Sequence, residues 1–453
     1  MATLPFDDGS CEVPAAVGGE LGKVIVIGAG IAGLTAANAL TTAGVDCVVL
    51  EARDRIGGRL HTVDVDGHPA DLGGAWIHHP DDNVLADWVQ AAGAAWIVDP
   101  TGTRFTGADL GEQRTLSADE VAGFGYSVFE PVAADLEAQL KAGAPDRSAA
   151  DVIDDHLTRT VAPGPARERL RQLMASMVEQ DAAGILDQVS ARWALTGGMF
   201  VGDVIDNVPT DGYRSVLAPL AAPSTVARNA PVRRVVQTDS GVEVHGDGWT
   251  ESGSHVIVTV PLGVLKSGAI EFDPPLPAER QAVIERTGFG TLDKVFLAFE
   301  EPFWRAKDPS LQHSVIFPAD RTEAATWTWD FGLSPTMMFL VAHGATRSML
   351  VDPRAWALEQ FACVYGEALP AAPTAVVHSD WLHDPFARGA YAHITPGNVA
   401  DDFDVLGEPV GRICFAGEHT GAERAGYADG AMSSGLREAK RLLQRRAVDL
   451  TCP

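Results

Sequence analysis

Residues 23–59, KVIVIGAGIAGLTAANALTTAGVDCVVLEARDRIGGR, are the stretch that decides the fold. The run Val24–Ile27 is β-branched throughout, which is typical of a parallel strand buried on both faces. Glycines follow at GxGxxG spacing, and an Ala-rich run of helical character begins at Ile31 and stops at Gly44. Strand, glycine turn and helix therefore arrive in the order of a dinucleotide-binding unit.

The three glycines have separate roles in such a unit. Gly28 permits the tight turn, Gly30 lets the backbone approach a pyrophosphate, and Gly33 lets the helix pack closely on the strand. The pyrophosphate then lies at the N-terminus of the helix, where free N–H groups favour an anion. A second apolar run, residues 47–50, ends at Glu51, whose carboxylate is placed to accept hydrogen bonds from a ribose 2′-OH. A 2′-phosphate would be repelled there, so NADP is disfavoured.

Two further segments carry a resemblance to a known family. Residues 51–59, EARDRIGGR, resemble the ExxxRxGGR continuation of the FAD-dependent amine oxidases. Residues 415–439, FAGEHTGAERAGYADGAMSSGLREA, resemble the closing motif of the same family. An ordinary strand, turn and helix would explain the glycines of the second segment, but not why one family's motifs recur at both ends. The resemblance implies an α/β protein with a Rossmann-type FAD-binding domain and an inserted α+β substrate domain, the amine oxidase two-domain fold.

The amino-acid composition of this 453-residue chain restricts its partners. Its 34 basic and 61 acidic residues give a net charge of −27, which argues against nucleic acid or an anionic membrane as a partner. The charge suits a cationic substrate, although acidity for solubility is an equal explanation. The five cysteines are scattered without a CxxC, so we expect no disulfide framework, no metal site and a reducing compartment. The segment before Lys23 lacks signal-peptide character, and no apolar stretch is long enough to span a membrane, so we expect a cytoplasmic protein.

The character of the chain changes twice along its length. From about residue 81 to 208 the segments are Ala-rich and helical in period, including 118–142, and strand signals are nearly absent. Strands return near residue 224, and residues 231–238 and 241–245 form a hairpin signal. We therefore expect an FAD-binding domain made of residues 1–80, 210–275 and 400–453, and a substrate-binding domain made of residues 81–209 and 276–399.

The resemblance also implies which residues hold FAD. The family's N-terminal fingerprint, its loop beside the flavin, its adenine-side backbone and its closing motif all have matching positions here. Ala390 stands where monoamine oxidases carry a flavin-linked cysteine, which implies that FAD is bound non-covalently. The matching positions are Gly28, Gly30, Ile31, Ala32, Gly33, Glu51, Ala52, Arg53, Gly58, Arg59, Gly74, Ala75, Trp76, Val232, Trp381, Gly417, Glu418 and Ala428.

Four residues are the candidates for chemistry. Lys294, in GTLDKVF, is similar to the family lysine that holds a water near flavin N5, and a surface lysine is the alternative. Tyr391 and Tyr427 match the two rings that flank the path to the flavin in monoamine oxidases, where an ammonium gains about 0.5–2 kcal/mol against a ring face. His78 matches the histidine of a WIHG-like loop in polyamine oxidases, and a structural role is its alternative. His79 replaces the glycine of that loop.

Residues that recognise the substrate are less well determined. The helical insertion is the expected source of acidic groups for the distal nitrogens of a polyamine, with the candidates Glu179, Asp181 and Asp187 unranked. Four tryptophans either line the substrate channel or pack in the core, namely Trp304, Trp327, Trp329 and Trp381.

The resemblance implies a reaction as well as a fold. It predicts oxidation of an amine at the carbon next to nitrogen, with hydride passing to flavin N5 and O2 reduced to H2O2. We expect a polyamine such as spermine, spermidine or an acetylated form as substrate, and arylalkyl or alkyl monoamines are the alternative. An FAD-dependent desaturase or porphyrinogen oxidase remains a third interpretation. The oligomeric state, monomer or homodimer, stays open.

Overall fold

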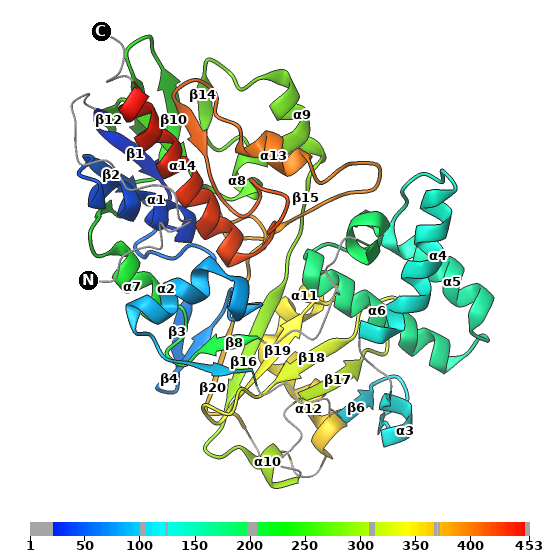
Figure 1. Ribbon diagram of the computed structural model, residues 1–453. Helices are drawn as coiled ribbons and strands as arrows, with labels where there is room; N and C mark the ends of the chain where they lie inside the picture. Colours follow the sequence, from blue (N-terminus) through cyan, green and yellow to red (C-terminus); the bar gives the residue numbers. More distant parts are fainter. Residues whose placement is uncertain are drawn as a thin grey trace.

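The computed structural model describes residues 21–99, 106–122, 126–196, 206–307, 313–366, 369 and 372–448. Most of the segment without signal-peptide character, residues 1–20, lies outside these ranges. An upper region contains the first strand and the last helix, and a lower region contains a large sheet with a group of helices beside it (Figure 1). The chain therefore builds two regions, each around its own sheet.

A five-stranded sheet forms the centre of the upper region. The predicted strand at Val24–Ile27 is β1, all of whose residues are buried, and every pairing in the sheet is parallel. Strand β1 lies between β13 and β2, and the edge strand β22, which pairs with β13, comes from the other end of the chain. The strands, in spatial order, are β22 (Ile413–Phe415), β13 (His255–Val258), β1, β2 (Cys47–Leu50) and β9 (Thr225–Ala227).

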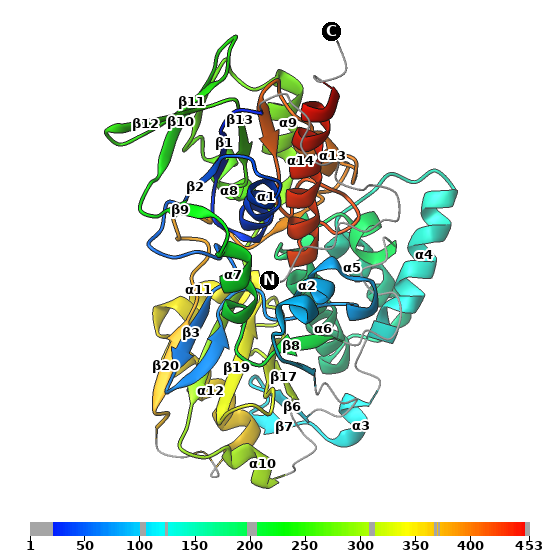
Figure 2. The ribbon, with the colours of Figure 1, turned by 60° about the vertical axis from the view of Figure 1, so that its left-hand side comes forward.

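Alternate residues of β1 pack into two different hydrophobic cores. Val24 and Val26 face helices α1 (Ile31–Thr42) and α14 (Ala428–Val448), which lie side by side (Figure 2). Ile25 and Ile27 face a four-stranded sheet that contains the predicted hairpin. Helices α2 (Val84–Ala92) and α7 (Arg214–Ala221) complete the helical side. The four strands are β12 (Trp249–Gly253), β11 (Val242–Gly246), β10 (Val232–Gln237) and β14 (Glu271–Asp273).

A seven-stranded sheet forms the lower region. One of its faces packs on helices α11 (His343–Val351) and α12 (Pro353–Tyr365). Part of its other face packs on the hairpin β3 (Thr62–Val65) and β4 (His68–Asp71), and another part on the helices of the insertion. The strands, in spatial order, are β20 (Ala375–His378), β16 (Asp293–Ala298), β19 (Thr336–Val341), β18 (Thr326–Trp329), β17 (His313–Phe317), β6 (Thr106–Asp109) and β7 (Arg114–Thr115).

The insertion is helical, as expected, but it also supplies four short strands. Strands β6 and β7 join the large sheet through a parallel pairing with β17, and β5 (Trp96–Val98) pairs with β8 (Asn207–Pro209). Runs of two to four residues that pair with distant partners leave no periodic pattern. The predicted helix over 118–142 is also interrupted, because α3 ends at Val121 and α4 begins at Glu130. The helices are α3 (Ala118–Val121), α4 (Glu130–Lys141), α5 (Ala149–Thr160) and α6 (Pro165–Ala182).

Arg280 joins three elements beside the parallel sheet. It lies on α9 (Ala278–Arg286), donates from Nη1 to the carbonyl of Leu406 at 2.8 Å and from Nη2 to that of Glu408, and lies 4.2 Å from the centre of the Phe415 ring. Leu406 is in the last turn of α13 (Asp402–Gly407), Glu408 directly follows that helix, and Phe415 is in β22. The buried guanidinium therefore connects α9 to the C-terminal end of α13 and to the sheet.

Replacing Arg280 with methionine is expected to lower the free energy of unfolding by about 2–4 kcal/mol, because two carbonyls lose charged donors in a buried place. Urea denaturation of the holoenzyme measures the change. Arg233→Met is the matched control, because Arg233 is half exposed and its pair with Asp247 is worth less than about 1 kcal/mol. Equal midpoints for the two variants would contradict the structural role of Arg280.

Candidate active site

The glycine turn at the end of β1 has the geometry of a pyrophosphate cradle. Gly28 has φ +104°, a conformation that favours glycine, and a Cβ on Gly33 would lie 2.0 Å from the carbonyl oxygen of Gly28. A Cβ on Gly30, by contrast, would have no protein atom within 4 Å. Ile31 and Ala32 open α1 directly behind it, and Gly30 provides no side-chain cap. Open space at Gly30, in front of free helix N–H groups, is what a bound pyrophosphate requires.

Glu51 lies beside this turn and is buried. Its carboxylate accepts hydrogen bonds from the backbone N–H of Ala29 at 2.7 Å and of Arg53 at 2.8 Å. Each oxygen keeps a lone pair for a further donor, such as a ribose hydroxyl. Arg53, next to Ala52, is held by Asp384 at 2.8 Å. The backbone of residues 229–230 hydrogen bonds to residues 51 and 53, which brings the start of β10 at Val232 to the same edge.

Arg59 and Glu418 join the two family motifs across 359 residues of sequence. Arg59 Nη1 donates to Glu418 Oε1 at 2.8 Å and to the carbonyl of Ala390. Burial raises the pKa of the Glu418 carboxyl, but the charge of Arg59 and hydrogen bonds from His419 and Arg59 outweigh it and hold that pKa at about 2. Glu418 is therefore ionised, and the motif at the N-terminal end meets the motif at the C-terminal end in one ion pair.

The remaining predicted FAD residues surround this ion pair. Gly58 has φ +59°, and its Cβ would touch Gly30 Cα at 3.5 Å, while Gly417 has φ +141°. The loop of Gly74, Ala75 and Trp76 begins with a hydrogen bond from Gly74 N to Arg59 O at 3.3 Å. Ala428 is the first residue of α14. Trp381 is buried, and its Nε1 donates to Leu72 O at 3.2 Å.

Lys294 is buried in the middle of the large sheet, which excludes the surface alternative. It lies in β16, and its Nζ donates to the carbonyls of Asp71 at 3.2 Å and Gly73 at 2.6 Å. The ammonium also lies 4.8 Å from the centre of the Trp76 ring. Burial lowers the pKa of Lys294 to about 8, against the opposing effect of the Asp71 charge. Lys294 therefore has a titration near neutral pH beside the predicted flavin loop.

The two predicted tyrosines and His78 lie together. The Tyr391 hydroxyl donates to the carbonyl of Gln180 at the end of α6. His78 meets the Tyr427 ring edge-on, with the ring centres 5.2 Å apart and the planes at 82°. Burial raises the pKa of both tyrosines, so both hydroxyls stay protonated. These three side chains form one wall that is anchored to the helical insertion.

The three acidic candidates have different positions. Asp187 is exposed in the short turn after α6, so it is not part of the site. Glu179 is buried, its Oε1 accepts from Leu186 N at 3.4 Å, and its charge interacts with Arg171 and Asp187. Asp181 interacts electrostatically with His78 and with the tyrosines. Burial raises the pKa of Asp181 to about 7.

Asp206 belongs to the candidate site but is not among the residues predicted from the sequence. Its Oδ2 lies 3.0 Å from His78 Nδ1, and its charge contributes to raising the pKa of Asp181. Asp206 Oδ1 and Asp181 Oδ2 are both buried without a hydrogen-bond partner in the described ranges. No motif separates Asp206 from the other acidic residues, and only the pairing of residue 207 with residue 77 brings it to His78.

The tryptophans divide between the site and the core. Trp304 packs among aromatic rings and donates to Asp330 at 2.7 Å, so a place in the channel is wrong for it. Trp327 and Trp329 lie on β18, and Trp329 meets Trp76 edge-on at 5.7 Å. Because Trp76 lies against Lys294, Trp329 belongs to the lining of the site. His79 has φ +48° in the loop that follows His78.

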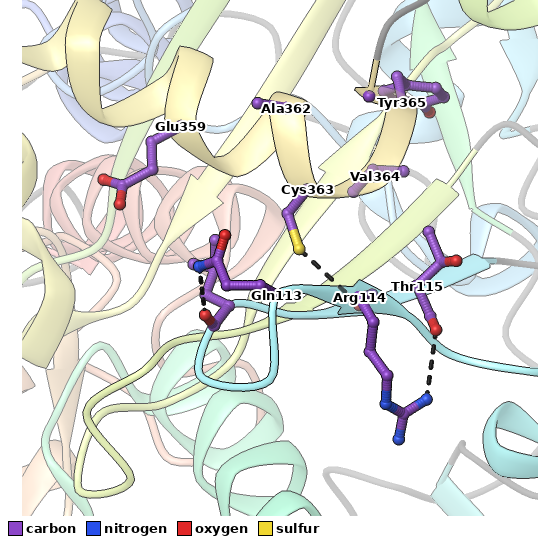
Figure 3. A pocket seen from close by; sticks show the side chains of 10 residues that line it. Gln113, Arg114, Thr115, Glu359, Ala362, Cys363, Val364 and Tyr365 are labelled. Atoms are coloured by element: carbon purple, nitrogen blue, oxygen red, sulfur yellow. Dashed lines mark hydrogen bonds between the residues drawn. The ribbon is translucent and has the colours of Figure 1, made fainter.

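Two hollows lie outside this wall. One of about 520 Å³ is lined by Arg53, His61, Trp381 and their neighbours. The other, of about 460 Å³, lies between β7 and α12, where the Cys363 thiol donates to the Arg114 carbonyl at 3.8 Å (Figure 3). The residues lining the second hollow include none of the predicted site residues, so the candidate active site is elsewhere.

A comparison with protein families agrees with this site. A family model described as flavin containing amine oxidoreductase matches residues 31–443, and the chain therefore belongs to that family. Membership confirms the predicted class, a flavin-dependent amine oxidase, and FAD as the cofactor. The cradle at Gly30 and the carboxylate of Glu51 fit this cofactor.

Three relatives show how broad this family is. AofH of Mycobacterium tuberculosis (strain ATCC 25618 / H37Rv), named as a flavin-containing monoamine oxidase, is 34% identical over 458 residues, covering 92% of this chain and 95% of AofH. Polyamine oxidase 2 of Arabidopsis thaliana is 29% identical over 453 residues, covering 93% and 89%. Lysine-specific histone demethylase 1 homolog 2 of Arabidopsis thaliana is 30% identical over 444 residues, covering 94% of this chain but 59% of that protein.

A solved structure has the same architecture. An engineered variant of putrescine oxidase, redesigned in its cofactor binding, matches with a TM-score of 0.74 and 25% identity, covering 94% of this chain and 99% of that one. This confirms the predicted two-domain fold. In the described ranges, no helix combines the length and apolarity that crossing a bilayer needs. The same ranges contain no group of three His, Cys, Asp or Glu side chains arranged for a metal ion.

Proposed function

We propose that this enzyme oxidises a diamine or polyamine, such as spermine, spermidine or an acetylated form, at a carbon next to nitrogen. FAD, held non-covalently, supplies the hydride acceptor, and O2 is the proposed final acceptor, giving H2O2. Residues of the chain bind and orient the amine, with Tyr391 and Tyr427 as the walls of its path and Lys294 beyond them. The proposed partners are thus an amine and O2, and the scattered cysteines favour the cytoplasm.

One observation carries the choice of substrate. Asp181 Oδ2 and Asp206 Oδ1 are buried carboxylate oxygens without a hydrogen-bond partner in the described part of the chain, beside the tyrosine wall. An unpaired buried carboxylate is costly unless a cation meets it. An amine with a second ammonium group supplies that cation while its first nitrogen lies between the rings. The names polyamine oxidase 2 and putrescine oxidase among the similar proteins support the same class.

A monoamine is the second candidate. The tyrosine pair favours it, because two rings suffice to orient one alkylamine and exclude water. AofH, named as a monoamine oxidase, is also more similar in sequence than polyamine oxidase 2. With a monoamine bound, Asp181 and Asp206 would have no ammonium group of the ligand beside them. The polyamine candidate therefore predicts that a second amino group improves the substrate, and the monoamine candidate predicts that it does not.

Anaerobic mixing of the yellow enzyme with single amines tests the proposal. The panel is spermine, spermidine, N-acetylspermine, putrescine, phenylethylamine and a set of amino acids, followed by flavin absorbance. Fast bleaching by a diamine or polyamine is expected. Bleaching by phenylethylamine alone would move the substrate to the monoamines, and bleaching by none would return the desaturase interpretation.

Above pH 8, where the Asp181 carboxyl is ionised although burial raises its pKa to about 7, Asp181→Asn is expected to reduce kcat/KM for the best polyamine by at least about tenfold, because the distal ammonium loses its anionic partner. The same variant should change kcat/KM for a monoamine by less than about threefold. Steady-state oxygen consumption measures both values. Asp187→Asn removes the same charge from an exposed position and serves as the control. Equal losses for both substrates would contradict a distal subsite.

A further inference from the structure

Asp206 fixes the position and the tautomer of His78. The Asp206 Oδ2 to His78 Nδ1 distance is 3.0 Å, and the two side chains are 19% and 33% exposed. An ionised carboxylate at Nδ1 requires a proton on that nitrogen, so Nε2 of the neutral ring carries a lone pair. The backbones on both sides are also tied, with Ile77 N to Asn207 O at 2.8 Å and Asn207 N to Ile77 O at 3.0 Å. The arrangement is that of an oriented base and its anionic partner.

We propose that Asp206 and His78 form a proton-accepting dyad, in which His78 Nε2 takes the proton that a bound alkylammonium must lose before oxidation. The inference rests on the proposed amine substrate. The N–H bond of R–CH2–NH3⁺ breaks, its electron pair stays on the amine nitrogen, and a new N–H bond forms at Nε2. The products are R–CH2–NH2 and an imidazolium, and no electrons are transferred in this step. Asp206 acts through His78 and is a positioning residue.

The charged groups that interact with His78 among the described residues are acidic. Asp206, which precedes β8, lies 3.0 Å from Nδ1, and Asp181 of α6 interacts with the ring electrostatically. Tyr427 meets the ring edge-on, and Arg424, which lies 5.0 Å from the centre of the Tyr427 ring, is paired with Asp429. An imidazolium formed at His78 therefore has an anionic partner at Nδ1.

Lys294 is a poorer base than His78 at this place. Its Nζ already donates to two backbone carbonyls and faces the Trp76 ring, and all three neighbours stabilise the ammonium form. Below its pKa of about 8 the ammonium form of Lys294 has no lone pair and cannot take a proton from substrate. The geometry therefore assigns proton acceptance to His78, and Lys294 keeps a separate role.

The test compares how flavin reduction by putrescine depends on pH in the wild type, Asp206→Asn and His78→Gln. Anaerobic stopped-flow absorbance gives the second-order rate constant from pH 6 to 10.5. In the wild type the acid limb should lie well below the amine's own pKa of about 10. In both variants it should move up to that value. His78→Gln should lose about tenfold or more at pH 7.5 and less than about twofold at pH 10.5, and Asp206→Asn, which also loses a carboxylate of the proposed distal subsite, should lose more at pH 7.5 than at pH 10.5. Asp187→Asn, the exposed control, should keep the wild-type profile.

Binding of an inert diamine separates chemistry from damage to the site. The probe is 2,5-dimethylhexane-2,5-diamine, whose amine-bearing carbons carry no hydrogen, and its Kd is read from the flavin spectrum. At pH 10.5 His78→Gln, which keeps both carboxylates of the proposed distal subsite, should bind it within about twofold of the wild type, whereas Asp206→Asn should bind it more weakly. An equal loss of rate at every pH, or an unchanged profile, would overturn the dyad. If Asp206→Asn does not retain FAD, His78→Gln decides by the same criteria, whereas an enzyme that no amine reduces contradicts the proposed function instead.

Discussion

Gly30→Val is expected to give a folded protein that does not retain FAD. The position has φ −72°, which valine accepts, and its Cβ would meet no protein atom within 4 Å. We expect the pyrophosphate of FAD to occupy this free space, so branched carbon there would displace the ligand while the chain keeps its packing. We expect a colourless protein with the far-UV spectrum of the wild type, and an FAD affinity reduced by at least about a hundredfold, which corresponds to about 2.7 kcal/mol. Absorbance at purification and equilibrium titration with FAD measure the effect.

Gly33→Ala is the matched control for that variant. Its Cβ would lie 2.0 Å from the carbonyl oxygen of Gly28 and 2.9 Å from Thr259 Oγ1, so the helix must move off the strand. This variant should lose stability as well as FAD, because backbone cannot give way as a flexible side chain can. A yellow, stable Gly30→Val protein would show that the open space at the glycine turn is not the pyrophosphate site.

Lys294→Met is expected to slow the reaction of reduced enzyme with O2 by about a hundredfold, the typical effect of removing one placed charge where negative charge develops. This expectation rests on O2 as the proposed acceptor. Because burial lowers the pKa of Lys294 to about 8, its charge is present below that pH and is lost as pH rises through it. The wild-type rate should therefore fall above pH 8, and the methionine variant should be slow at every pH. Reduction with dithionite followed by mixing with O2 measures the step without any amine.

The control for this variant is Lys141→Met, because Lys141 is exposed on α4 and pairs only with Glu137. FAD content should match the wild type in both proteins. A Lys294→Met enzyme that reoxidises at the wild-type rate, with the same pH dependence, would remove Lys294 from the oxygen reaction.

The sequence predicted best the parts whose signal is local. Strand β1, the glycine turn and helix α1 follow one another directly, and each leaves its own periodicity or spacing in the chain. The family motifs at Arg59 and Glu418 were found separately, and the structure joins them in an ion pair. The assignment of individual residues to FAD or to the amine stays a prediction that the variants above test.

The parts that depend on distant contacts could not be found in this way. Strand β6 pairs with β17, which lies about 200 residues further along the chain, and β7 pairs with β6. Trp304 was a channel candidate by composition, and the aromatic core around it decides otherwise. Asp206 has no neighbours in the sequence that mark it, and its role depends on the pairing of residues 77 and 207. No short stretch of the sequence shows which distant residues will bury a side chain.

The separation of Arg59 and Glu418 along the sequence also affects the order in which this protein folds during its synthesis. β1 and α1 are synthesised well before β22 and α14, which complete their sheet and pack on α1. Until α14 is made, α1 has only α2 and α7 of the described helices as neighbours in this core, and Arg59 lacks the carboxylate of Glu418. The ion pair that joins the two motifs therefore forms only after residue 418 has been synthesised, late in the folding of this domain.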